Sequence, residues 1–302
     1  MTYNDLYESI RRKGSFLCIG LDPDMKLIPE HIRRNSPDPI FEFNKEIIDA
    51  TAPYAIAYKP NLAFYEAEGA EGWEQLAMTV DYIKYKDPSL FVIADAKRGD
   101  IGNTASQYAK AFFETMDCDA VTLSPYMGSD TVEPFLKYKD KWAIILALTS
   151  NPSAVEFETL NIWEHISVVD EPEGMYVGES PMTYIRPDDG APLYQKVIAT
   201  AMKWGNSSNT MFVVGANRAI ELSKIREYCP NHFLLVPGVG RQGGNIGEVA
   251  RYGMNNRCGL IVNMSRDIIF AGNGEDFARK AAKKAAEAAA EMSRILSFHQ
   301  MK

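Results

Sequence analysis

Cysteine is scarce in this chain of 302 residues, and its spacing carries no motif. The four cysteines are Cys18, Cys118, Cys229 and Cys258. They lie far apart and form no CxxC pair, so neither a disulfide framework nor a thiolate metal site is indicated. The first fifteen residues, MTYNDLYESIRRKGS, contain no apolar core of the kind found in secretory signals. The sequence therefore predicts a reduced, cytoplasmic protein.

Long apolar runs and an excess of basic residues are also absent. No run approaches the length of about 18 apolar residues that indicates a membrane-spanning helix, so no membrane partner is expected. The formal net charge is −8, which disfavours binding to a nucleic-acid backbone. An anionic ligand would have to be held by a local cluster of donors against this overall field.

Metal-binding and cofactor-binding patterns are missing as well. The four histidines are His31, His165, His232 and His299. They are isolated from one another and form no HExxH motif, so surface or structural roles are expected for them. The sequence also carries no pyridoxal or thiamine motif. We therefore predict no metal site and no cofactor.

Eight short apolar runs alternate with amphipathic segments of helical length. The runs cover residues 16–21, 55–58, 91–94, 120–123, 142–148, 211–215, 233–236 and 259–263. Helices are predicted at 41–51, 72–85, 105–116, 193–205 and 275–296. Eight buried strands alternating with helices favour a parallel sheet closed into a (β/α)8 TIM barrel rather than an open sheet. We assign residues 1–302 to one α/β barrel domain.

One connection breaks this rhythm. Residues 151–190, after the fifth predicted strand, are rich in proline, glycine and acidic residues. They are too long for a simple connection. The sequence predicts a lid or an elaborated βα loop there, and no second domain.

Charged side chains are concentrated at the end of the third predicted strand, in the stretch FVIADAKRGDIGNT. Because side chains two apart share one face of a strand, Asp95 and Lys97 are predicted to point the same way. Asp100 follows in a loop, and Thr104 or Asn103 is expected to cap the next helix. A solvated, salt-bridged loop is the alternative interpretation.

Polar residues follow the other predicted strands too, which favours a functional ring. They include Asp22, Lys59, Asn61, Ser124, Thr149, Ser150, Asn217, Ser265 and Arg266. In TIM barrels the reacting groups collect at the carboxyl ends of the strands, whereas the opposite face serves stability. The pattern therefore predicts an active site at this end of the barrel.

A glycine-rich turn follows the seventh predicted strand. Gly238, Gly240 and Gly243 form a GxGxxG pattern, but a dinucleotide-binding turn belongs after the first strand of an open sheet. Barrels often bind a phosphate group in the loops after strands seven and eight. Gln242 and Arg266 would add side-chain donors there. A phosphate site is predicted, with a purely conformational glycine turn as the alternative.

Four motifs together resemble the orotidine 5′-monophosphate decarboxylase family. They are AYKPN at 57–61, DAKRGDI at 95–101, LTSNPS at 148–153 and PGVGRQGG at 237–244. Their order matches the family, and the long segment after the fifth strand is most similar to the bacterial group with longer chains. The resemblance extends from Cys18 to Arg266, which is nearly the whole chain.

The resemblance implies roles for four charged residues. Lys97 resembles the general acid that protonates C6 of the pyrimidine after CO2 leaves. Asp95 would lie against the substrate carboxylate. Lys59 would bind a ribose hydroxyl and Asp95, while Asp22 would bind a ribose hydroxyl. The family uses no cofactor and converts orotidine 5′-monophosphate to UMP, the last step of de novo pyrimidine nucleotide synthesis.

The resemblance also implies the remaining substrate contacts. Ser150 would contact the pyrimidine, and Gln242 and Arg266 would bind the phosphate. Pro237 would be a further substrate-binding residue.

Three more residues imply an assembly. The family counterparts of Asp100, Ile101 and Thr104 reach into the neighbouring subunit's site. A homodimer with shared active sites is therefore expected.

The charge pattern is consistent with this chemistry independently of the resemblance. Decarboxylation leaves a carbanion that no carbonyl is positioned to delocalise, so fixed charges must stabilise it. An alternating array of Lys59, Asp95, Lys97 and Asp100 would supply those charges, with each cation kept protonated by neighbouring anions.

A magnesium-dependent sugar-phosphate decarboxylase on the same barrel is the main alternative. It would need a further carboxylate ligand, for which Glu66 and Glu68 are the candidates near the second strand. A non-catalytic nucleotide-binding barrel is a second alternative, but it would be expected to lack Asp95 or Lys97.

Overall fold

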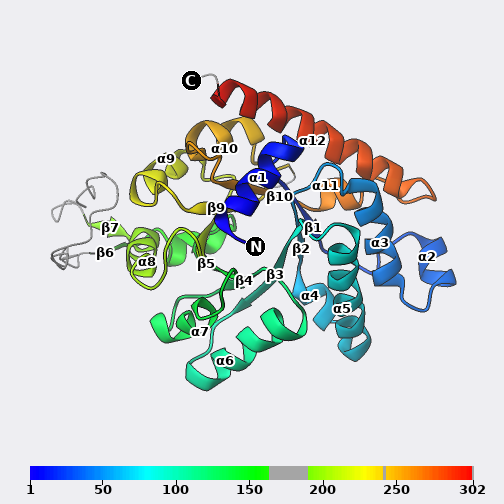
Figure 1. Ribbon diagram of the computed structural model, residues 1–302, viewed down its shortest axis with the longest axis horizontal. Coiled ribbons are helices and arrows are strands. Elements are labelled where there is room, and N and C mark those ends of the chain that lie inside the picture. Colours follow the sequence, from blue (N-terminus) through cyan, green and yellow to red (C-terminus); the bar gives the residue numbers. More distant parts are fainter. Residues whose placement is uncertain (163–189, 241–242, 301–302) are drawn as a thin grey trace.

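Eight parallel strands form a closed barrel in the computed structural model, which describes residues 1–162, 190–240 and 243–300 (Figure 1). Around the barrel the strands follow the order β1-β10-β9-β8-β5-β4-β3-β2. Their bounds are β1 Leu17–Leu21, β2 Ala57–Pro60, β3 Phe91–Arg98, β4 Ala120–Leu123, β5 Trp142–Leu148, β8 Thr210–Val214, β9 Phe233–Pro237 and β10 Leu260–Met264. The predicted (β/α)8 TIM barrel is confirmed, and each of its strands overlaps one of the eight predicted runs.

Helices surround the barrel and cover the outer faces of the strands (Figure 1). Their bounds are α1 Tyr3–Lys13, α2 Glu30–Asn35, α3 Pro39–Thr51, α4 Leu62–Glu66, α5 Gly69–Lys86, α6 Gly102–Lys110, α7 Glu133–Leu136, α8 Leu193–Ala201, α9 Ala219–Tyr228, α10 Ile246–Gly253, α11 Arg266–Ile269 and α12 Phe277–Gln300. Strands covered on both faces are buried along their length, as in β1 and β8, which explains their nearly continuous apolar sequences. No helix among the described residues is long and apolar enough to span a membrane.

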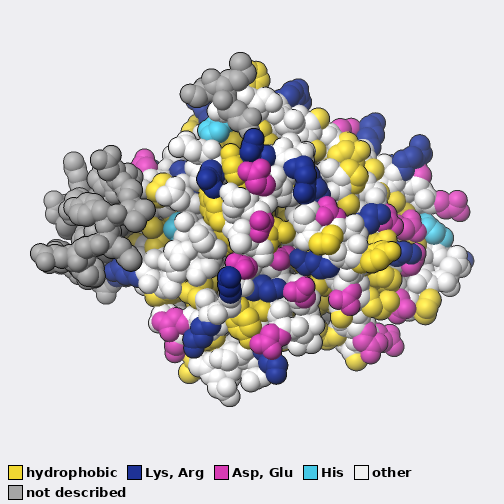
Figure 2. Space-filling model, viewed as in Figure 1, with side chains coloured by type: hydrophobic (Ala, Val, Ile, Leu, Met, Phe, Trp, Pro, Cys, Tyr) yellow, Lys and Arg dark blue, Asp and Glu magenta, His cyan; other side chains and the backbone are white. Residues whose placement is uncertain are grey.

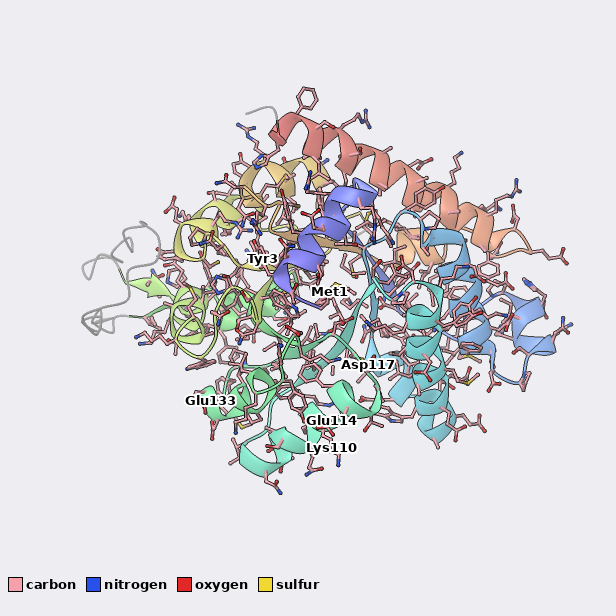
Figure 3. All side chains as sticks on the ribbon, in the orientation of Figure 1. Met1, Tyr3, Lys110, Glu114, Asp117 and Glu133 are labelled. Atoms are coloured by element: carbon pink, nitrogen blue, oxygen red, sulfur yellow. The ribbon has the colours of Figure 1, made fainter. Side chains whose placement is uncertain are left out.

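Helix α1 closes the amino-terminal end of the barrel. The ring of Tyr3 lies 4.9 Å from that of Phe233, the first residue of β9, and Trp142 at the start of β5 donates its indole N–H to the carbonyl of Met1. Figure 3 shows Met1 and Tyr3 over the middle of the barrel. On this face basic and acidic side chains are interspersed (Figure 2). The opposite, carboxyl end of the barrel is thus the one available for a site.

The start of α6 differs from the prediction. The helix begins at Gly102, whose φ is +53°, with Ile101 at the N-cap and no side-chain capping bond. Asn103 and Thr104 therefore lie within the first turn, and the prediction that one of them caps the helix is wrong. The chain enters the helix earlier because glycine tolerates the left-handed conformation at that turn.

The connection after β5 is described at both of its ends. Residues Pro152–Glu156 form a 3-10 turn, and β6 Asn161–Ile162 pairs antiparallel with β7 Ala191–Pro192. Residues 163–189 lie outside the described part of the chain. The role of 151–190 as a lid, and the assignment of 1–302 to a single domain, stay predictions.

Candidate active site

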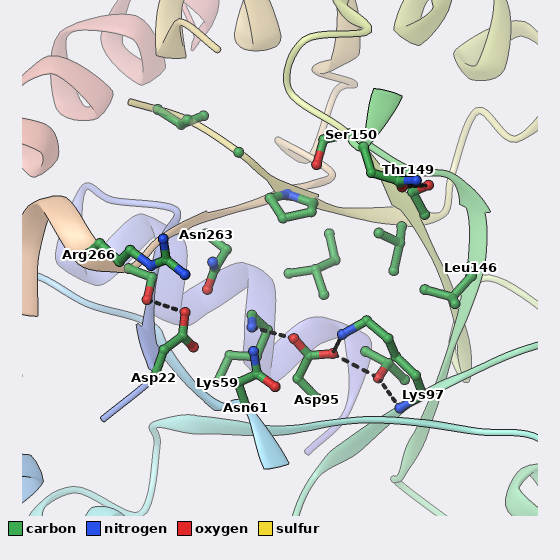
Figure 4. A pocket seen from close by; sticks show the side chains of 18 of the residues that line it. Asp22, Lys59, Asn61, Asp95, Lys97, Leu146, Thr149, Ser150, Asn263 and Arg266 are labelled. Atoms are coloured by element: carbon green, nitrogen blue, oxygen red, sulfur yellow. Dashed lines mark hydrogen bonds and ion pairs between the residues drawn. The ribbon is translucent and has the colours of Figure 1, made fainter. Parts of the chain in front are cut away.

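A cavity of about 390 Å³ lies at the carboxyl ends of the barrel strands (Figure 4). Ten of the predicted site and ring residues line it: the catalytic candidates Lys59, Asp95 and Lys97, the binding candidates Asp22, Ser150, Pro237 and Arg266, and the ring residues Asn61, Thr149 and Ser265. The charged residues among them come from the ends of β1, β2, β3 and β10, which meet at this end because the strands are parallel.

Lys59 and Asp95 form a buried ion pair between neighbouring strands. Lys59 Nζ lies 2.6 Å from Asp95 Oδ2, and their side chains are only 5% and 10% exposed. Burial alone would lower the pKa of Lys59, but the carboxylates of Asp95 and Asp22 outweigh it and hold this pKa above its usual range. Burial would likewise raise the pKa of Asp95, yet Lys59 and Lys97 hold it far below the ordinary value. Both groups are therefore charged at neutral pH.

Lys97 completes a row of three charges. Its Nζ lies 2.5 Å from Asp95 Oδ1, and its side chain is half exposed toward the cavity. Figure 4 shows Lys59, Asp95 and Lys97 side by side. The predicted pairing of Asp95 and Lys97 is present, but it does not arise from regular strand alternation. Lys97 has a φ of +47°, and the register between β3 and β4 shifts between Ala94 and Arg98.

Asp22, at the end of β1, lies beside Arg266 and away from Lys97 (Figure 4). Ser265 donates its hydroxyl to Asp22 Oδ2 at 2.6 Å. The other carboxylate oxygen of Asp22 and the side-chain oxygen of Asn263 are buried and have no hydrogen-bond partner among the described residues. Because buried acceptors without a donor are costly, these two oxygens are suited to hydroxyl groups of a ligand in the cavity.

The glycine-rich turn lies at the same end of the cavity. Gly238 and Gly240 have φ angles of +95° and +88°, and a Cβ atom on Gly240 would lie 2.0 Å from the carboxylate of Asp267. The positive φ angles favour glycine at both positions, and a side chain at 240 would also displace the carboxylate of Asp267. Gly238 and Arg266 both line the cavity. Gln242, the other predicted phosphate donor, lies outside the described residues.

Three predicted residues do not line the cavity of their own chain. Asp100 accepts the backbone N–H of Ile101 at 2.8 Å, while the side chain of Ile101 is half exposed and Thr104 is exposed. Within one chain, the predicted alternating array therefore has three of its four members.

Thr122 and Asn263 are among the cavity residues that the sequence did not predict. Sequence reasoning selected Ser124 for the fourth strand, but that residue does not line the cavity, and its backbone N–H donates to the carbonyl of Arg98 instead. The sequence does contain a signal for Thr122 and Asn263. Each is a lone polar side chain inside a short, buried strand, and a buried polar group needs a hydrogen-bond partner.

The carboxylates required by the magnesium alternative lie elsewhere. Glu66 forms an ion pair with Arg98, Glu68 precedes α5, and neither lines the cavity. Among the described residues, no group of three or more His, Cys, Asp or Glu side chains is arranged to hold a metal ion. This donor set does not favour the alternative.

Comparison with known proteins identifies the family. A sequence model described as "Orotidine 5'-phosphate decarboxylase / HUMPS family" matches residues 15–171. An orotidine 5'-phosphate decarboxylase of Phocaeicola vulgatus is 50% identical over 98% of this chain and 99% of its own length. The chain belongs to this family. An orotidine 5'-phosphate decarboxylase of Flavobacterium johnsoniae is 49% identical, with 98% of each chain covered.

Solved structures agree with membership of the orotidine 5'-phosphate decarboxylase family. The OMP decarboxylase of Leishmania donovani superposes with a TM-score of 0.74 at 32% identity, covering 97% of this chain and 99% of that one. The UMP synthase of the same organism superposes with a TM-score of 0.74 at 32% identity, covering 96% of this chain but only 57% of that one. The predicted family and its enzyme class, a carboxy-lyase, are confirmed.

Proposed function

We propose that this protein decarboxylates orotidine 5′-monophosphate to UMP and CO2, the last step of de novo pyrimidine nucleotide synthesis, without a metal or organic cofactor. The observation that carries the proposal is the row of Lys59, Asp95 and Lys97 in the cavity, with Nζ–Oδ distances of 2.6 and 2.5 Å. Family membership supplies the substrate. The arrangement supplies fixed charges for a reaction that develops negative charge on carbon.

The cavity offers groups suited to each part of this substrate. Arg266 and the turn at Gly238 offer donors to the phosphate. Asp22 Oδ1, which has no hydrogen-bond partner among the described residues, and the ammonium of Lys59 suit ribose hydroxyls. Ser150, on the other side of the cavity in Figure 4, is assigned to the pyrimidine. Gln242 and Pro237 complete the proposed contacts.

Lys97 is assigned the proton transfer. As the bond between C6 and the carboxylate breaks, CO2 leaves and the electron pair remains on C6. The ammonium of Lys97, held by Asp95 at 2.5 Å, stabilises this charge and donates a proton to C6. The product is UMP, and the neutral lysine regains a proton from solvent. Asp95 holds both lysine side chains in place through its two ion pairs.

We further propose a homodimer in which Asp100, Ile101 and Thr104 complete the partner's site. The exposed position of Ile101 and Thr104, and the absence of all three from their own chain's cavity, support this assignment. Asp100 of the partner would then be the fourth member of the charge array. A cytoplasmic location and closure of 151–190 over the substrate belong to the same proposal.

Product analysis tests the proposal directly. Purified protein incubated with orotidine 5′-monophosphate should release CO2 and UMP in equal amounts. Recovery of unchanged substrate, with folding verified by circular dichroism, would overturn the proposal.

A further inference from the structure

The backbone of Lys97 is held in an unusual conformation for a lysine. Its φ of +47° lies in the left-handed region, which costs a residue with a Cβ atom about 1 kcal/mol or more. The residue sits where the pairing of β3 with β4 shifts register, between Ala94 and Arg98. Such a conformation persists only where neighbouring groups hold it.

One side chain on the neighbouring strand β4 holds the backbone of Lys97. Thr122 lines the cavity and is only 1% exposed. Its Oγ1 accepts the backbone N–H of Lys97 at 2.9 Å and donates to Asp95 Oδ1 at 3.1 Å. A single hydroxyl thus links the backbone of Lys97 to the carboxylate that holds the Lys97 ammonium.

We propose that Thr122 is a positioning residue for Lys97, a role that rests on the proposed function. Asp95 Oδ1 accepts hydrogen bonds from both the Lys97 ammonium and the Thr122 hydroxyl. The same oxygen therefore holds the side chain of Lys97 directly and its backbone through Thr122. Loss of the hydroxyl releases the backbone of Lys97 from its acceptor and leaves the ammonium on a less constrained side chain. Thr122 itself transfers no proton and touches the reaction only through Lys97 and Asp95.

Paired substitutions separate this role from packing. Thr122→Val keeps the shape of the side chain but removes both hydrogen bonds, whereas Thr122→Ser keeps the hydroxyl. Thr79→Val is the matched control. Thr79 on α5 is equally buried, donates to the carbonyl of Gln75 and accepts from Asn44, and does not line the cavity.

The measurements are kcat and KM for orotidine 5′-monophosphate, and the Kd of UMP by calorimetry. T122V should lose roughly 10- to 100-fold in kcat, the size of effect that small misplacements of reacting groups produce, with the Kd of UMP nearly unchanged. T122S should retain most of the rate, and T79V should lower stability without a selective loss of kcat. Wild-type kcat in T122V, or an equal loss in T122S, would overturn the proposal.

A crystal structure of T122V gives a readout that does not depend on activity. A change in the φ of Lys97, or separation of its ammonium from Asp95, supports the positioning role; an unchanged φ near +47° and an unchanged ion pair overturn it. If T122V does not fold, Thr122→Ala carries the same measurements. If the wild-type protein does not turn over the substrate, the proposed function fails, and the crystal structure still decides the role of Thr122.

Discussion

Lys59 and Asp95 form an ion pair of 2.6 Å in which both side chains are at least nine-tenths buried. Taking two charges out of water is expensive, and their attraction repays this cost only with good geometry and further hydrogen bonds. Asp95 has those further bonds, from the Lys97 ammonium and the Thr122 hydroxyl. This carboxylate therefore receives three donors in all and organises the charged wall of the cavity.

Lys97→Ala should abolish turnover and leave nucleotide binding largely in place. The variant loses both the proton donor and a stabilising charge, so we expect kcat to fall by at least about 1,000-fold. UMP affinity, measured by calorimetry, should change little because the phosphate and ribose contacts remain. Lys110→Ala is the control, since Lys110 is exposed on α6 at the periphery of the molecule (Figure 3). An active Lys97→Ala enzyme would remove Lys97 from the proposed role.

Mixing inactive variants tests the shared active site. If Asp100 acts across the interface, a mixture of Lys97→Ala and Asp100→Ala homodimers should regain up to about a quarter of wild-type activity after subunit exchange, because half the dimers are mixed and each has one intact site. Lys97→Ala mixed with Asp95→Ala is the matched control. Those two residues pair within one chain, so no mixed dimer has an intact site. Equal activity in the two mixtures, with exchange verified by mass spectrometry, would contradict sharing.

Arg266→Ala should weaken use of the phosphorylated substrate selectively. Hydrogen bonds to charged groups contribute about 1.5 to 3 kcal/mol, so we expect kcat/KM for orotidine 5′-monophosphate to fall roughly 10- to 100-fold. The rate with orotidine, which has no phosphate, should not change. Arg279→Ala, at a residue 83% exposed on α12, is the control. A comparable loss of activity with both substrates would show that Arg266 does not act through the phosphate group.

We expect the buried side chain of His232 to make the protein less stable in mild acid. Both ring nitrogens are buried without a partner among the described residues, and burial followed by the charge of Arg226 lowers its pKa from 6.5 to about 4. The unfolded chain therefore binds a proton at a higher pH than the folded one, so stability falls as pH drops from about 6.5 toward 4. Between pH 7 and pH 5 this amounts to about 2 kcal/mol.

His232→Leu removes this titration. The free energy of unfolding is measured in urea at pH 7 and pH 5. Lowering the pH should destabilise the wild type more than the variant. A difference between the two proteins that does not depend on pH would show that His232 does not titrate in this way.

The barrel was predictable because its strands are short apolar runs between amphipathic helices, a pattern that burial on both faces imposes. The charged residues at the strand ends were predictable for a related reason, since parallel strands bring their carboxyl ends together. Strand alternation correctly predicts that Asp95 and Lys97 lie together, but the backbone that brings them together is not a regular strand. The left-handed conformation of Lys97 coincides with the register shift against β4, a tertiary feature with no local sequence signal.

Other parts of the site depended on contacts that a sequence does not display. Ser124 follows its strand and was the natural choice, yet Thr122 inside the strand faces the cavity. Glu66 was a plausible metal ligand by position, but its partner is Arg98, more than thirty residues away in sequence. The start of α6 was misjudged because a glycine, rather than a capping side chain, makes the turn.

The most direct test is the loss of absorbance of orotidine 5′-monophosphate with purified protein, measured with and without excess EDTA. We expect rapid turnover that EDTA does not affect, because the charges of Lys59, Asp95 and Lys97 supply the stabilisation. No turnover, or turnover abolished by EDTA, would contradict the proposed function.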